Sequence, residues 1–231
     1  MDKNKLMIDC FRLLMPHIGE HDKSHDLEHM RRVFNLGMRI AKSETIQVTD
    51  YDILIPALIF HDSVIFRKDD PRNNLAPSKS ADLAEVLLKS VPGYPEIKIK
   101  RVKDCIQECS FSNGIEPSTW ESAILQDADK LESVGALAIM RTFSSGGEMN
   151  RPFYNPLDPL CKGEVTEKVG ASIELFKKRL FVVAKTMSTN EGKRLAQKRV
   201  TFLRSFWERY KEELIEGGVI DEKLEPLETE Y

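Results

Sequence analysis

The chain has 231 residues and a mass of 26.4 kDa, which is enough for one well-buried core. Charged residues make up 31% and hydrophobic residues 41% of it, as in ordinary globular proteins rather than disordered or fibrous ones. The net charge of −3 argues against a binder of nucleic-acid polymers, which would carry a concentrated basic face. No apolar run is long enough to span a membrane, and residues 1–6 lack the apolar core of a signal peptide. We therefore expect a cytoplasmic protein without a membrane partner.

The first half of the chain shows apolar residues at helical spacing. Helices are predicted over residues 3–15, 24–42, 53–60, 78–90, 96–109 and 120–131, the last continuing to residue 142. Ser24 is a suitable N-cap for the second, and Thr49 opens a capping box before the third. The third helix is apolar nearly all round, and this pattern predicts a central buried helix. Pro56 within it is expected to cost a hydrogen bond. It ends at His61 and Asp62, two polar residues placed directly after an apolar run.

The second half is predicted to contain one long loop and two long helices. The glycine- and proline-rich segment 144–159 is expected to be a functional or mobile loop. Helices over 165–187 and 190–214 follow, the second with a capping box at Ser188. The aromatic stripe Phe202, Phe206 and Tyr210 on that helix is expected to pack in the core. The chain is thus predicted to be all-α, with one domain over residues 1–218 and an acidic tail over 219–231.

Chemistry-bearing residues gather at the start of the second helix. His25, Asp26, His29 and Arg32 are three or four residues apart, so they share one helix face. All five histidines lie within the first 61 residues, which excludes a two-metal centre that draws histidines from several later helices. One metal held by two histidines and two carboxylates is the economical arrangement.

A carboxylate for such a site is expected from the helix over 120–131. Asp127 and Asp129 point about 200° apart on a helix, and spacing alone leaves the choice between them open. A metal held this way would activate water and polarise a phosphoryl oxygen, so hydrolysis of a phosphate ester or anhydride is the natural chemistry. Basic side chains beside it would hold phosphate oxygens. The candidates are Arg32, Lys68, Lys130, Arg141 and Arg151.

A seryl or cysteinyl nucleophile is not favoured by the sequence. No GxSxG motif is present, and no histidine follows residue 61 to activate Cys109 or Cys161. The four cysteines are scattered without a CxxC pair, so we expect reduced structural thiols.

Three segments, SHDLEHMRRV, ALIFHDS and ILQDADKLESVGALAIMRTF, closely resemble the HD-superfamily phosphohydrolases. That superfamily carries an H…HD…D pattern on an all-α bundle with one or two divalent metals. The KDDPR loop, the CSFSNG turn, the GGxxxRPxY loop and the long C-terminal helices are similar to those of small stand-alone bacterial HD hydrolases. The resemblance implies an HD-domain helical bundle with a long C-terminal helical hairpin.

Position by position, the resemblance places the metal ligands at His29, His61, Asp62 and Asp129, and so selects Asp129 over its neighbour. Two departures concern catalysis. Many HD nucleotidases have glutamate three residues after the HD pair, where this chain has Ile65, and relatives often have histidine in the turn that here begins at Cys109. Proton transfer is therefore assigned to Asp26, with His25 and Lys130 as substitutes.

The expected function is metal-dependent hydrolysis of a small phosphorylated molecule, with a nucleotide as the first choice and either phosphate or pyrophosphate as the product. Hydrolysis of a guanosine alarmone is the alternative reaction. A metal-containing ligand sensor without turnover is the alternative class, and Ile65 favours it. The ligand set suits Mn, Fe, Co, Ni or Zn, and Mg less well. The oligomeric state is left open between monomer and homodimer.

Overall fold

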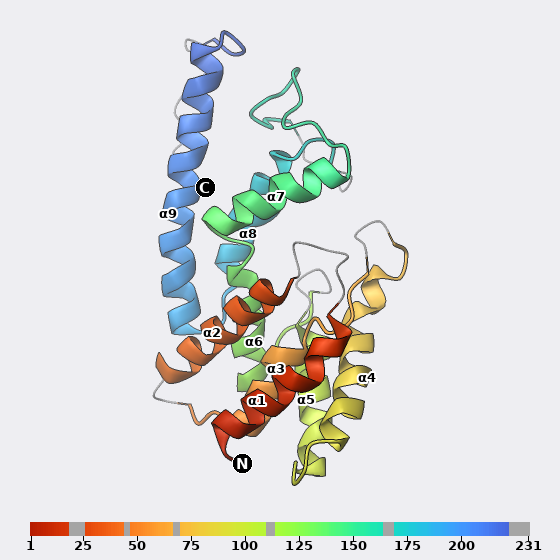
Figure 1. Ribbon diagram of the computed structural model, residues 1–231. Helices are drawn as coiled ribbons and strands as arrows, with labels where there is room; N and C mark the ends of the chain where they lie inside the picture. Colours follow the sequence, from red (N-terminus) through yellow and green to blue (C-terminus); the bar gives the residue numbers. More distant parts are fainter. Residues whose placement is uncertain (19–25, 44–46, 67–69, 110–113, 164–168, 222–231) are drawn as a thin grey trace. The chain divides into compact units, whose positions relative to one another are not determined.

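The computed structural model describes the chain except for residues 19–25, 44–46, 67–69, 110–113, 164–168 and 222–231. The described residues form helices, turns and one isolated bridge between Asn155 and Asp158, and no strand is found among them (Figure 1). The all-α prediction is confirmed. None of the described helices has the length and apolar character needed to cross a membrane.

The residues group into two compact units. Unit 1 comprises Met1–Lys130 with Ser188–Gly192, and unit 2 comprises Leu131–Met187 with Lys193–Tyr231. The prediction of one domain over residues 1–218 stays a prediction. The predicted acidic tail falls mostly on residues 222–231, outside the described part of the chain.

Unit 1 is built around α3. Its helices are α1 (Lys3–Leu14), α2 (Leu27–Ser43), α3 (Tyr51–Phe60), α4 (Ala76–Lys89), α5 (Glu96–Glu108) and α6 (Trp120–Leu131). Every residue of α3 from Ile53 to Phe60 is buried, those other than Pro56 being at most 1% exposed, and α1, α2, α4 and α5 all contact this helix. Pro56 has no N–H for the carbonyl of Asp52, and the Tyr94 hydroxyl donates to that carbonyl at 2.7 Å instead. The central, buried position of α3 is as predicted, and the hydrogen bond that Pro56 removes is replaced by the one from Tyr94.

The helix starts differ by one or two residues from the predicted caps. Asp26 caps α2 by accepting from the His29 N–H at 2.8 Å, and Ser24 lies outside the described residues. Asp50, not Thr49, caps α3, because its carboxylate accepts from the Asp52 N–H at 3.1 Å. These shifts leave the helices in the expected order.

Unit 2 contains α7 (Ala136–Glu148), α8 (Phe181–Val183) and α9 (Asn190–Glu216) from Lys193 onward. The predicted continuation of α6 to residue 142 is wrong. The helix ends at Leu131, and Gly135 has a φ of +97°, which only glycine adopts easily, before α7 begins. The predicted loop over 144–159 is wrong in its first part, since Gly146 and Gly147 lie inside α7.

The predicted long helix over 165–187 is also corrected. Its described part is a series of short pieces: a π-helix at Phe176–Leu180, α8, and a 3₁₀ turn at Ala184–Thr186. Phe176 is fully buried and its ring stacks on Phe206 with centroids 5.4 Å apart. A π-turn takes one extra residue, which lets neighbouring apolar side chains face inward together.

The last helix, α9, is long and amphipathic as predicted. Its N-cap is Thr189 rather than Ser188, with the Thr189 hydroxyl accepting from the Gly192 N–H at 3.0 Å. Phe202 was expected in the core but is 49% exposed. The buried face is one step away on the helix, at Ala196, Val200, Leu203, Trp207 and Leu214.

Candidate metal centre

The first ligand candidate, His29, lies in the first turn of α2 and is fully buried. Its backbone N–H is held by the Asp26 carboxylate at 2.8 Å. Further along α2, Gly37 lies so close to α3 that a Cβ atom there would be 2.4 Å from Leu58 Cδ2. This close approach of α2 to α3 brings His29 next to the end of α3, where the HD pair lies.

His61 follows the last residue of α3 and is 2% exposed. Its Nδ1 is 3.0 Å from the Leu58 carbonyl, an acceptor that only an Nδ1–H can satisfy. The tautomer is therefore fixed with the proton on Nδ1, and Nε2 keeps its lone pair. Nε2 is buried, makes no hydrogen bond within the described part of the chain, and lies 3.5 Å from Asp62 Oδ2.

Two carboxylates complete the cluster. Asp62 Oδ2 is 3.4 Å and Asp129 Oδ1 is 3.7 Å from His29 Nε2. One ligand atom from each of His29, His61 and Asp62 lies within 4.8 Å of the others. Two imidazole nitrogens and two carboxylates gathered in this way fit a divalent metal ion, because each of these groups is a ligand for such ions. The histidines are buried and the carboxylates are 27–28% exposed, so the cluster opens to solvent on its carboxylate side.

Asp127 has a different partner from Asp129, although both lie on α6. It is fully buried and accepts from the Ser188 N–H at 2.9 Å, from the Thr189 N–H at 2.7 Å and from the Thr189 hydroxyl at 2.7 Å. Burial raises the pKa of the Asp127 carboxyl, and these hydrogen bonds only partly offset that effect. Asp127 is therefore bound to the start of α9, which agrees with the choice of Asp129 as the ligand candidate.

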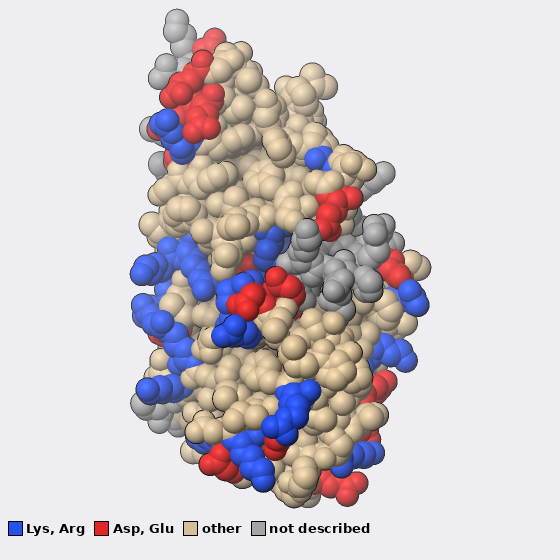
Figure 2. Space-filling view, viewed as in Figure 1, with Lys and Arg blue, Asp and Glu red and all other residues tan. Residues whose placement is uncertain are grey.

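The predicted catalytic and substrate residues lie in several places. Asp26 is exposed at the start of α2, and Arg32 is partly buried one turn after His29. Figure 2 shows several groups of basic side chains on one face of the molecule. The basic residues of α2 are Arg31, Arg32, Arg39 and Lys42. Arg141 and Arg151 belong to unit 2, where Arg141 donates to the Glu132 carbonyl at 3.5 Å. His25 and Lys68 lie outside the described residues.

Lys130 follows Asp129 and is 7% exposed. Its ammonium donates to Gln126 Oε1 at 3.1 Å. Gln126 in turn donates to the carbonyls of Glu108 and Ile115 at 2.7 and 2.9 Å, and so connects the end of α5 and Ile115 to α6. Burial, with smaller effects from the Asp129 and Asp62 carboxylates, holds the pKa of the Cys109 thiol well above its ordinary value.

From the sequence, Gln126 was included in the cluster around Asp127 and Asp129 but given no role of its own, and Ser80 was not identified. Ser80 is fully buried on α4, and its hydroxyl contacts the backbone just after the HD pair. A signal for it was available, since positions 80, 84, 87 and 88 share one helix face and only Ser80 is polar there.

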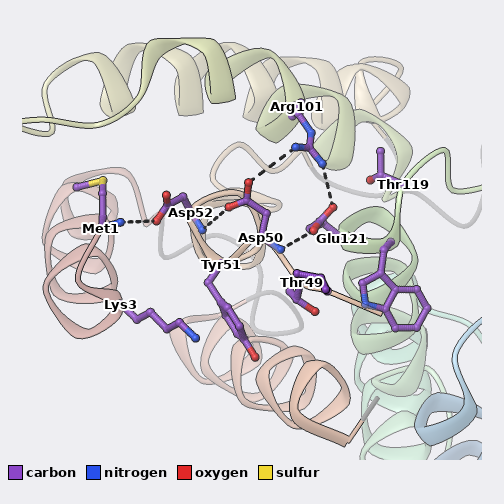
Figure 3. A pocket seen from close by; sticks show the side chains of 11 residues that line it. Met1, Lys3, Thr49, Asp50, Tyr51, Asp52, Arg101, Thr119 and Glu121 are labelled. Atoms are coloured by element: carbon purple, nitrogen blue, oxygen red, sulfur yellow. Dashed lines mark hydrogen bonds and ion pairs between the residues drawn. The ribbon is translucent and has the colours of Figure 1, made fainter. Parts of the chain in front are cut away.

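A separate cavity of about 560 Å³ lies at the opposite end of α3 from the HD pair (Figure 3). The acidic residues that line it accept hydrogen bonds from neighbouring backbone and basic groups. Asp50 N–H donates to Glu121 at 2.7 Å, Arg101 donates to Glu121 at 3.3 Å, and Lys98 donates to Asp50 and Asp52 at 2.9 and 2.8 Å. This network fastens the start of α3 to α5 and α6.

Comparisons with known proteins agree with this description. No family model matches the chain. The protein YpgQ of Bacillus subtilis (strain 168) is 25% identical over 193 residues, which are 82% of this chain and 84% of YpgQ. A crystal structure of YpgQ in complex with ADP is similar with a TM-score of 0.68 and 21% identity, covering 92% of this chain and 97% of that one.

Two further crystal structures are similar over almost their whole length. One, from Lactobacillus plantarum, has a TM-score of 0.72 and 23% identity, covering 92% of this chain and 98% of that one. The other, an HD-superfamily hydrolase from Bacillus thuringiensis, has a TM-score of 0.66 and 25% identity, covering 91% and 97%. The chain thus has the HD-domain fold, and the resemblance of its motifs to the HD-superfamily hydrolases is confirmed.

Proposed function

We propose that this protein is a metal-dependent phosphohydrolase that cleaves a phosphate monoester or phosphoanhydride bond of a small phosphorylated molecule. The observation that carries the proposal is the convergence of His29, His61, Asp62 and Asp129 in a chain with the HD-domain fold. The crystal structure of YpgQ with ADP supports a nucleotide as the substrate class.

His29, His61, Asp62 and Asp129 would hold one divalent ion. When bound, such an ion supplies Lewis acidity toward a phosphoryl oxygen and lowers the pKa of water. The open side of the cluster is formed by the carboxylates, so a substrate approaches from there while the buried imidazoles stay shielded. Arg32 lies one helical turn from His29, where a guanidinium can hold a phosphate oxygen.

Proton transfer is assigned to Asp26 and Lys130. One Asp26 oxygen accepts from the His29 N–H, and the residue is exposed at the edge of the site, where protons exchange with solvent. Lys130 is held at Gln126 and can donate a proton or stabilise negative charge from the buried side. His25 stays an alternative to them, and Lys68, Arg141 and Arg151 stay candidates for phosphate contact.

A nucleotide screen with metal analysis tests the proposal. The purified protein is assayed for bound metal and for release of phosphate and of pyrophosphate from a panel of nucleotides. Asp129→Ala should lose metal and turnover together. Asp104→Ala, a partly exposed acidic position on α5 that pairs with Lys100, is the matched control and should lose neither. Full turnover by Asp129→Ala would overturn the proposal.

Two other functions, a metal-containing sensor and a guanosine alarmone hydrolase, are alternatives to this proposal. Ile65, at the position where many HD nucleotidases have glutamate, favours a metal-containing sensor that binds its ligand without turnover. Bound metal and nucleotide without release of any product from the panel would establish that function instead. Guanosine alarmone hydrolysis uses the same ligand set, and inclusion of an alarmone in the panel separates it from hydrolysis of ordinary nucleotides.

A further inference from the structure

The backbone that follows Asp62 is held by a residue of another helix. Ser80, in α4, accepts from the Val64 N–H at 3.0 Å and donates to the Val64 carbonyl at 3.3 Å. The Ser63 hydroxyl donates back to the Ser80 carbonyl at 3.5 Å. These contacts connect α4 to the two residues directly after the HD pair.

Helix packing alone does not explain a serine at position 80. Ser80 lies on the buried face of α4 with Ala81, Ala84 and Leu88, and it is itself fully buried. An alanine would suit this face without the cost of burying a hydroxyl. The hydroxyl instead meets one backbone segment, and that segment is adjacent to a candidate metal ligand.

The other member of the HD pair is fixed from within its own helix. His61 is oriented through the Leu58 carbonyl, three residues earlier. Asp62 lies past the end of α3, in one last turn that the Ser63 N–H closes by donating to the Phe60 carbonyl at 3.1 Å. Beyond that turn the backbone at Val64 is held by Ser80. A contact that fixes residues 63 and 64 therefore limits the directions in which the Asp62 carboxylate can point.

We propose that Ser80 is a positioning residue of the candidate metal centre: from α4 it fixes the backbone after Asp62 and so directs that carboxylate toward His29 and His61. This inference rests on the metal site of the proposed function. It concerns metal affinity, which can be measured without any knowledge of the substrate.

The test is Co²⁺ binding to the metal-free protein, followed by the visible absorption of the bound ion. Ser80→Ala should raise the dissociation constant for Co²⁺ by ~10-fold or more, the usual effect of losing a group that orients a ligand. The matched control is Ser90→Ala at the end of the same helix, where the hydroxyl donates to the Leu87 carbonyl at 2.6 Å, remote from the HD turn in sequence. That variant should stay within about twofold of the wild type.

Two further variants distinguish a loss of folding from a loss of metal binding. Ser80→Cys keeps the branching of the side chain, with a larger sulfur in place of the oxygen, but is a weaker hydrogen-bonding group. It should therefore also weaken Co²⁺ binding, and it carries the test if Ser80→Ala does not fold. Asp62→Ala should abolish binding. Loss of binding in Asp62→Ala together with unchanged affinity in both folded Ser80 variants would overturn the role of Ser80 alone. A wild-type protein that binds no Co²⁺ would overturn the metal centre itself, and with it this inference.

Discussion

Asp127 and Asp129 should respond in opposite ways to the same substitution. Asp127→Asn keeps the shape of the side chain but replaces one acceptor oxygen by an NH₂ group, which must face an N–H or hydroxyl donor of Ser188 or Thr189. A buried donor left without an acceptor costs about 1–3 kcal/mol, and a weakened helix cap about 1 kcal/mol more. We expect the free energy of unfolding to fall by about 2–4 kcal/mol.

Asp129→Asn should have little effect on the stability of the metal-free protein. The Asp129 side chain is 27% exposed and belongs to the open side of the cluster, so its loss leaves no buried donor of a helix start unsatisfied. A change below about 1 kcal/mol is expected for such a position. This variant should instead lose Co²⁺ binding, which Asp127→Asn should retain.

Urea unfolding of both variants in the presence of a chelator, together with Co²⁺ titration, gives the two measurements. The reasoning is refuted if Asp129→Asn is the more destabilised variant, or if Asp127→Asn abolishes metal binding while its fold is intact. Either result would mean that the roles of the two aspartates have been exchanged.

Three other measurements test the packing and charge of the structure. Gly192→Ala should destabilise the protein by about 1–3 kcal/mol in thermal unfolding, because its Cβ would lie 2.4 Å from Asp127 Oδ2, whereas Gly147→Ala, in open space within α7, should stabilise it by about 0.5–1 kcal/mol. Burial raises the pKa of Asp52, but hydrogen bonds from Lys98 and the Met1 amino group outweigh it and the net pKa is lowered. The stability from Asp52 is therefore present above the ordinary carboxyl pKa of about 4 and is lost as pH falls through the lowered value, so Asp52→Asn should flatten the stability profile below about pH 4. All four cysteines are buried, and a thiol reagent at pH 8 should react with them in denaturant but not in the folded protein; rapid modification of the folded protein would contradict the packing.

The sequence predicted the helices of unit 1 well because one simple rule governs them. Each has a single apolar face or, for α3, apolar residues all round. Side-chain caps mark the starts of α1, α2, α3 and α6, whereas α4 and α5 begin without one. The predictions failed in unit 2, where tertiary contacts override local preference. Gly146 lies inside α7 although glycine disfavours helices, because a Cβ there would be 2.0 Å from Ser172 Oγ, so only glycine allows this approach.

The π-helix in unit 2 could not be read from periodicity. The residues around Phe176 repeat at a spacing that fits an ordinary helix, and the extra residue per turn at Phe176–Leu180 is decided by aromatic packing with Phe206 and Trp207. Contacts of this kind join residues about thirty positions apart. A local pattern contains no information about them.

At the candidate metal centre, the spacing of histidines and carboxylates predicted a cluster of ligands but did not decide which aspartate belongs to it. It left Asp127 and Asp129 as equal candidates, and the family resemblance selected Asp129. The structure supplies a physical reason for that selection, since the carboxylate of Asp127 is already bound to the start of α9 while Asp129 approaches His29. What distinguishes the two is a partner sixty residues away, which neither helical periodicity nor motif spacing can reveal.

The candidate ligands are held in place by contacts with the surrounding helices and not by contacts with one another. The Asp26 carboxylate holds the backbone of His29, the Leu58 carbonyl sets the tautomer of His61, and Asp129 lies on a helix buried at nearly every position. These contacts are made within the chain, so the ligands lose their conformational entropy when the protein folds. Metal binding then requires no further loss of this entropy. In small metal-folded domains the ligands become ordered only when the ion binds. Here the helices of unit 1 bury a continuous apolar core around α3, and this core orders the ligands. Metal affinity should therefore depend as much on the groups behind the ligands as on the ligands themselves.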